Sequence, residues 1–165
     1  MVSTRRIAYV AVVTLLAAVL ALVACHAVPL TPHSDVVVNG TFVMWAGGCQ
    51  NSACFPIVVT AKMLNPELVG WFTVYGQTGN AIQVAVMTDA DFGSWWYWGE
   101  WPPARSGGYD SGPVTEGTDS FDVHLQYDSH IGYKNNNYYV VYGNSLLCCP
   151  ESVTTEVYFN YDTQP

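Results

Sequence analysis

Alternating apolar and polar residues predict β-strands along most of the chain after position 35. In residues 120–127, for example, Phe121, Val123 and Leu125 fall on one face and polar residues on the other. Comparable strand patterns occupy residues 36–38, 41–46, 57–63, 68–75, 81–88, 138–142 and 153–161. Clusters of Gly, Pro, Asn and Asp separate these segments, as turns require. Seven or eight short strands predict an all-β fold, an antiparallel β-sandwich or a small barrel.

Three places depart from plain alternation. The Asn39-Gly40 pair predicts a turn or bulge, and Asn65-Pro66 predicts a turn before the strand at 68–75. Residues 89–96 are the one stretch with helical character, where Asp89 or Asp91 can cap a single turn.

The N-terminus has the parts of an export signal. Arg5 and Arg6 precede an apolar run of 18 residues, 7–24, and the run ends in Leu22-Val23-Ala24-Cys25. That ending resembles a bacterial lipobox, which predicts that residues 1–24 are removed and that Cys25 is lipidated. An uncleaved signal anchor is the alternative, and the positive-inside rule then places the domain on the same outer side. Ordinary cleavage near Ala27 is a third possibility and releases the domain.

Residues 25–34 predict a short extended tether between this anchor and a domain at 35–165. The segment contains Pro29 and Pro32, which favour extended backbone. It also contains His26 and His33, which we interpret as solvated linker residues, weak metal binding being the alternative.

Charge excludes some partners. The 13 acidic residues all lie after position 25, together with only three basic ones (Lys62, Arg105 and Lys134), so this part is about 10 charges negative. A nucleic-acid partner is therefore excluded, since its binding depends on Lys and Arg. Anionic lipid headgroups should repel the domain, so membrane attachment must come from the N-terminus.

Four segments carry a family resemblance. Residues 82–92 contain Val84-Ala85-Val86-Met87-Thr88, followed four positions later by Phe92. Residues 138–144 begin with Tyr138-Tyr139 and end at Asn144, and an alternating final strand follows them. Together with residues 65–75, this series resembles the secreted jelly-roll domains of prokaryotes that are similar to the eukaryotic GOLD domain. The resemblance spans about residues 36–161 and implies an antiparallel sandwich that serves as an interaction module, with no catalytic residues. The Trp-rich insertion after Phe92 and the four Cys of the domain depart from the pattern.

The four Cys predict two disulfides in an oxidising compartment. They are Cys49, Cys54, Cys148 and Cys149, and their spacing matches no common zinc pattern. In the jelly roll that the resemblance implies, the first and last strands pair. The loop with Cys49 and Cys54 would then lie beside the loop with Cys148 and Cys149, which favours two bridges between the loops. A Cys49–Cys54 bridge with a vicinal Cys148–Cys149 bridge is the alternative.

The most unusual segment is rich in Trp: Trp95, Trp96, Trp98 and Trp101 precede Pro102-Pro103. If this segment is extended, its rings cannot all face one core, and exposed rings can stack on sugars or anchor a protein. The alternative interpretation is that the rings cover the end of the sandwich.

Acidic residues also occur near predicted turns (Asp89, Asp91, Asp110, Asp119 and Asp128). Their spacing is not specific to a glycosidase or a calcium site, so we interpret them as turn and cap residues.

The sequence shows no nucleophile elbow, phosphate loop or metal-ligand motif. We therefore expect a non-enzymatic, membrane-anchored lipoprotein of the cell envelope that faces outside the cytoplasm and needs no cofactor or metal. It would act as a binding or envelope-structural module for a glycan or protein partner. The alternative is a carbohydrate-binding module that uses the four Trp residues above.

Overall fold

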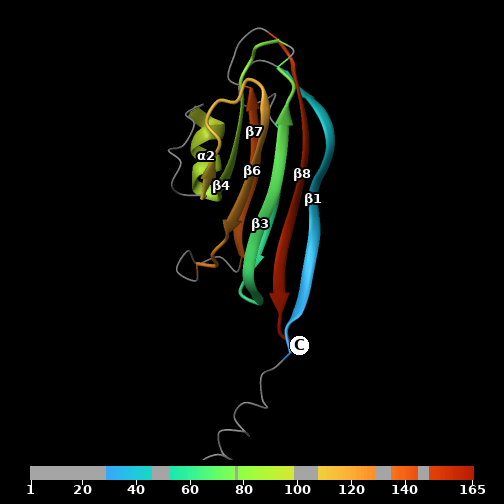
Figure 1. Ribbon diagram of the computed structural model, residues 1–165. Coiled ribbons are helices and arrows are strands. Elements are labelled where there is room, and N and C mark those ends of the chain that lie inside the picture. The colour runs from blue at the N-terminus through green and yellow to red at the C-terminus, as the bar shows by residue number, and fades with distance from the viewer. Residues whose placement is uncertain (1–28, 46–52, 77, 99–107, 129–134, 145–148) are drawn as a thin grey trace, which may run out of the picture. The chain divides into compact units, whose positions relative to one another are not determined.

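The computed structural model describes residues 29–45, 53–76, 78–98, 108–128, 135–144 and 149–165 (Figure 1). Strands dominate these ranges: β1 (Thr31–Met44), β2 (Ala53–Thr60), β3 (Met63–Val74), β4 (Ile82–Thr88), β5 (Tyr109–Asp110), β6 (Gly117–His124), β7 (Asn135–Asn144) and β8 (Glu151–Thr163). One helix, α2 (Asp89–Trp98), follows β4 directly. The all-β fold is confirmed.

The strands form two four-stranded antiparallel sheets in jelly-roll order. One sheet has the order β1-β8-β3-β6 and the other β2-β7-β4-β5. The first strand pairs with the last, the second with the seventh, the third with the sixth and the fourth with the fifth. This is a long hairpin wrapped on itself, so that each sheet receives alternate strand pairs. The sandwich occupies Thr31–Thr163 as one compact unit.

The core lies between the sheets and is built by the alternation seen in the sequence. Along β8, Val153, Thr155, Val157 and Phe159 are buried, while the residues that alternate with them stay partly exposed. The core packs so closely against β3 that position 70, on its buried face, has room only for glycine. A Cβ atom there would lie 2.8 Å from the carbonyl oxygen of Glu156 and 2.8 Å from Cγ2 of Val157.

The boundaries of β2 and β3 correct two sequence interpretations. The chain turns at Ala61-Lys62, inside the strand predicted over residues 57–63. β3 continues through Asn65-Pro66, which was predicted as a turn. The pairing of β3 with β8 slips there, between Leu64 and Glu67, and Asn65 has a φ of 51°. Asn accepts this left-handed backbone better than most residues, so Asn65-Pro66 forms a bulge instead of a turn.

The start of β1 corrects the predicted tether. β1 begins at Thr31, so the last residues of the segment 25–34 belong to the sheet. His33, interpreted as a linker residue, stacks on Tyr161 with ring centroids 4.8 Å apart, and its Nε2 lies 3.0 Å from the Thr163 hydroxyl. The slip in β1 lies between Val36 and Val38, and not at Asn39-Gly40 where it was expected.

The predicted signal or anchor segment, residues 1–24, lies outside the described ranges. Within those ranges, no helix combines the length and the apolar character that crossing a membrane requires.

Candidate functional site

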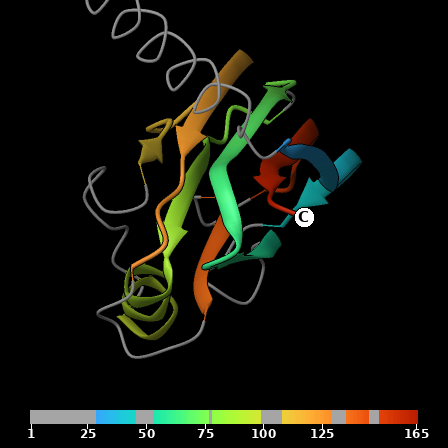
Figure 2. The same cartoon turned by 90° about the horizontal axis from the view of Figure 1, so that it is seen from below.

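The two outer faces of the sandwich differ in what covers them. Helix α2 packs on β4 and β7, over the outer face of the β2-β7-β4-β5 sheet. Its Trp95 forms a small outer core there with Ala85, Met87 and Val141. Figures 1 and 2 both show α2 on the side of the sandwich away from β1 and β8. The outer face of the β1-β8-β3-β6 sheet carries no helix in the described part of the chain.

Thr88 caps the start of α2. The backbone N–H of Asp91 lies 3.4 Å from the Thr88 hydroxyl, and that hydroxyl donates to the Asp91 carboxylate. Thr88 is thus the capping residue, and Asp91 supports it from the first turn. Asp89, the other predicted cap, instead accepts a hydrogen bond of 2.9 Å from the Tyr139 hydroxyl. Burial and this contact with Asp89 raise the pKa of Tyr139.

The helix changes the interpretation of the Trp-rich segment, because residues 95–98 are helical and not extended. Trp95 is only 4% exposed and belongs to the outer core, whereas Trp96 is 43% exposed and Tyr97 more so. Trp101 and the side chain of Trp98 lie outside what the structure describes. Of the four predicted ligand-binding Trp residues, Trp95 therefore offers no ring face, and Trp96 remains a candidate.

The uncovered sheet presents an aromatic and polar surface that the sequence did not single out. Trp71 on β3 and Tyr75, the residue directly after β3, are 36% and 48% exposed. Four threonines (Thr41, Thr154, Thr73 and Thr118) form a row across β1, β8, β3 and β6. The Tyr75 hydroxyl lies 3.0 Å from the Thr154 hydroxyl.

Glu156 on β8 holds the side chains around Trp71 in place. Its carboxylate accepts hydrogen bonds from Nε1 of Trp71 at 3.3 Å and from Nδ2 of Asn39 at 3.2 Å. It also accepts one from the Tyr158 hydroxyl, and this bond raises the pKa of Tyr158. We call Asn39, Trp71, Glu156 and Tyr158 the Glu156 network. Three donors on one carboxylate fix the orientation of two aromatic rings before any ligand arrives.

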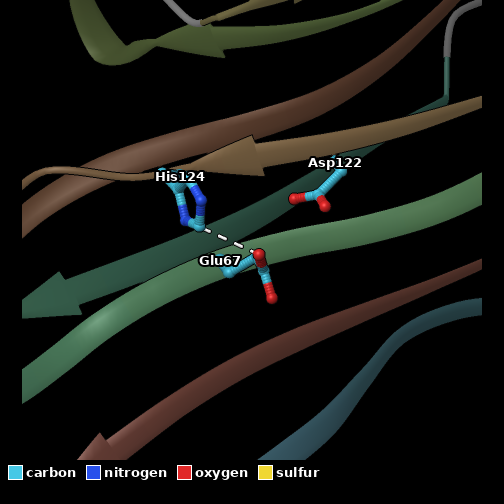
Figure 3. Close-up of side chains that lie close together, drawn as sticks. All are labelled: Glu67, Asp122 and His124. Carbon is cyan, nitrogen blue, oxygen red and sulfur yellow. Dashed lines mark ion pairs between the residues drawn. The ribbon is translucent and has the colours of Figure 1, made fainter.

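A second group lies on the same face, at the edge strand β6. Pairing of β3 with β6 places Glu67 directly opposite His124, and Asp122 lies two positions away on the same face of β6. One possible ligand atom from each of these residues lies within 4.8 Å of the others. Nδ1 of His124 lies 3.5 Å from Oε1 of Glu67 (Figure 3). Sequence reasoning placed Asp122 and His124 on one strand face but could not bring Glu67 to them.

The acidic residues near turns have structural partners. Oδ1 of Asp110 accepts from the backbone N–H of Gly112 at 2.9 Å and from Nε2 of Gln83 at 2.8 Å. Asp119 accepts from the Tyr109 hydroxyl at 2.7 Å. Burial and Asp119 raise the pKa of Tyr109. These contacts agree with a turn and strand role for the carboxylates.

The structure places only part of the predicted disulfide framework. Met44 at the end of β1 is paired with Glu151 at the start of β8, so the two strand ends next to the cysteine-bearing segments lie side by side. Cys54, predicted in the loop, lies instead in β2 opposite Val141 and packs against the outer core. The backbone oxygen of Cys149 accepts hydrogen bonds from Asn80 and Asn144. Cys49 and Cys148 lie outside the described residues, as does Cys25, so both bridges and the lipidation remain predictions.

Comparison with known proteins assigns no family to the chain. No protein-family model matches it, and neither does any curated protein. Among solved structures, it is similar to dimeric latent PorU from Porphyromonas gingivalis, with a TM-score of 0.31 and 6% sequence identity. That match covers 80% of this chain but only 14% of the PorU chain, and a likeness this weak carries no argument. The resemblance to GOLD-like domains stays a prediction.

Proposed function

We propose that this chain is a non-enzymatic binding module, held at a membrane by its N-terminus and facing outside the cytoplasm. The observation that carries the binding role is the uncovered outer face of the β1-β8-β3-β6 sheet. There Trp71 and Tyr75 are exposed, and hydrogen bonds to Glu156 and Thr154 orient them. Large aromatic side chains that lose little freedom on binding dominate the energy of many interfaces.

The chemistry of this face favours a neutral saccharide as the ligand. A sugar ring offers an apolar C–H face to an aromatic side chain and hydroxyls to carboxylates and amides. The Glu156 network supplies both partners within one site. Lys62 is the sole Lys or Arg in the described ranges, and it lies in the turn before β3, so the described residues of this face offer no Lys or Arg to an anionic ligand. Tyr75 lies four positions after Trp71, so their Cα atoms are about 13 Å apart along an extended backbone, a span that suits an extended glycan better than one ring.

Helix α2 offers a second candidate surface through Trp96 and Tyr97. Both side chains are exposed, which keeps the earlier prediction of binding through the Trp-rich segment open. Within the described residues, however, no hydrogen bond is seen that orients either ring. The sheet face is therefore the stronger candidate, and the two can be separated by mutation.

A glycan array with the full chain tests the saccharide assignment. We expect Trp71→Ala to weaken binding to the selected glycan by about 1–3 kcal/mol, the range of an aromatic anchor, while Trp96→Ala binds as the unmodified chain does. Glu156→Gln should weaken binding as well, because it removes charge from the acceptor that orients Trp71. An array with no bound glycan would refute the saccharide proposal, and equal losses in both Trp variants would refute the choice of face.

Mass spectrometry of the membrane-extracted protein tests the anchor. The lipobox resemblance predicts a chain that starts at Cys25 and carries a diacylglyceryl group. A chain that still starts at Met1, with Cys25 unmodified, would contradict lipidation and support the signal anchor.

A further inference from the structure

We propose that Glu67, Asp122 and His124 form a binding site for a divalent transition-metal cation such as Zn²⁺. The site lies at the β6 edge of the uncovered sheet and does not depend on the proposed saccharide binding. No sequence motif indicated it, because its ligands come from two strands that are far apart in the chain.

The spacing of the donor atoms fits one ion. Two ligands bound to the same Zn²⁺ at about 2.0–2.2 Å and at tetrahedral angles lie about 3.3–3.6 Å apart. Nδ1 of His124 and Oε1 of Glu67 are already 3.5 Å apart. The whole set lies within 4.8 Å, so a small side-chain rotation of Asp122, which is exposed, completes the spacing (Figure 3).

The backbone holds these three positions firmly. Glu67 and His124 are direct cross-strand partners, and Val69 opposite Asp122 continues the same ladder. Inward neighbours of the ligands are core residues: Leu68 on β3, and Phe121 and Val123 on β6, are buried. The Cβ atoms of the ligands are thus fixed by packing on the far side of the sheet, which is how a rigid scaffold presents a metal site.

An ordinary surface ion pair explains only part of this group. It accounts for Glu67 with His124 but leaves Asp122 as a second carboxylate beside Glu67. Asp122 lies diagonally across from Glu67, close enough for the two like charges to repel, and within the described residues no Lys or Arg forms an ion pair with either carboxylate. A bound dication would neutralise both carboxylates at once.

The ligand types indicate the class of metal. An imidazole nitrogen with two carboxylates suits Zn²⁺ and other first-row transition ions, whereas Ca²⁺ and Mg²⁺ prefer sets made of oxygen alone. Three protein ligands leave at least one coordination position for water or for an oxygen atom of a bound ligand.

Isothermal titration of the full chain with Zn²⁺ tests the site. We expect one strong site per chain, with His124→Ala and Asp122→Asn each weakening the affinity at least tenfold, since even changes outside the ligand set commonly cost 10–100-fold. His33→Ala is the matched control, because His33 is a histidine on the same sheet that lies outside the cluster, and its affinity should equal that of the unmodified chain. Ca²⁺ in excess should not displace the zinc.

Co²⁺ substitution separates this site from the cysteines. Ligation by nitrogen and oxygen gives no thiolate-to-metal charge-transfer band, so we expect none. Three results would each overturn the proposal. They are a zinc affinity that is unchanged in both His124→Ala and Asp122→Asn, a thiolate band with Co²⁺, and no Zn²⁺ binding in the millimolar range. Unchanged circular dichroism and melting temperature in the exposed-site variants would show that their loss of affinity is not unfolding.

Discussion

Trp95 and Trp96 are neighbours on α2 with opposite surroundings, which makes their replacement by Ala a sharp test of how the helix packs. Trp95 is 4% exposed and lies against Ala85, Met87 and Val141, while Trp96 is 43% exposed. Truncating a buried Trp to Ala costs about 3–5 kcal/mol. The outer core is a single layer under one helix, so we expect Trp95→Ala to fall near the lower end, about 3 kcal/mol. Trp96→Ala should cost less than about 1 kcal/mol.

Urea unfolding followed by far-ultraviolet circular dichroism measures both values without relying on Trp fluorescence. The two variants gain the same helix propensity, so the difference between them isolates burial. For a domain of this size, about 3 kcal/mol corresponds to a fall in melting temperature of roughly 10 °C. Equal losses below 1 kcal/mol would show that α2 does not pack on the sheet through Trp95. A larger loss at Trp96 would mean that the helix turns its opposite face inward.

Three further predictions follow from the core and the cysteines. Gly70→Ala should lower the free energy of unfolding by about 1–3 kcal/mol, because the added Cβ would lie 2.8 Å from a backbone oxygen, whereas Gly93→Ala, in open space on α2, should raise it by up to about 1 kcal/mol. Urea midpoints that move in the same direction in both variants would contradict this prediction. Burial raises the pKa of Tyr142 to about 12, so the unfolded state loses this proton first, and the free energy of unfolding falls as the pH rises from 10 to 12. The share of Tyr142 in this loss at pH 11 is about 1.4 kcal/mol, so the loss of stability between pH 9 and pH 11 should be smaller by that amount in Tyr142→Phe than in the unmodified chain. Peptide mapping without reductant should join the peptides of Cys49 and Cys54 to those of Cys148 and Cys149, and reduction should lower the melting temperature; four free thiols would defeat that prediction.

Strands with one wet face could be predicted closely from the sequence. In β6 from Phe121 onward, and in β8 as far as Phe159, every second residue is buried. Burial of one face therefore produces a period of two in the sequence. The turn that carries the chain from β2 in one sheet to β3 in the other could not be predicted, because its residues Ala61-Lys62 include no Gly, Pro, Asn or Asp. The residues that do, Asn65-Pro66, form a bulge, and bulges draw on the same residue types as turns.

The Glu67, Asp122 and His124 group could not be predicted, because it depends on strand register. Alternation shows which face each residue takes, but not which residue of a distant strand lies opposite. Helix α2 was within reach of the sequence, since Thr88-Asp89-Ala90-Asp91 has the spacing of a capping box. In a helix that starts at this cap, the neighbours Trp95 and Trp96 point in different directions around the helix axis, so one ring can lie inward while the other lies at the surface.

The contrast between continuous and alternating apolar runs also explains which sheet stays open. Residues 84–87 of β4 are buried at every position, and Val140, Val141 and Tyr142 of β7 are buried together. A strand without a polar face requires a cover on both sides, and α2 provides it over β4 and β7. The outer positions of β3, β6 and β8 are instead mostly Thr, Ser, Asn, Asp, Glu, Trp and Tyr, residues that tolerate water. Because side chains of these types tolerate water, this face does not require a helix to cover it, and its exposed aromatic rings are accessible.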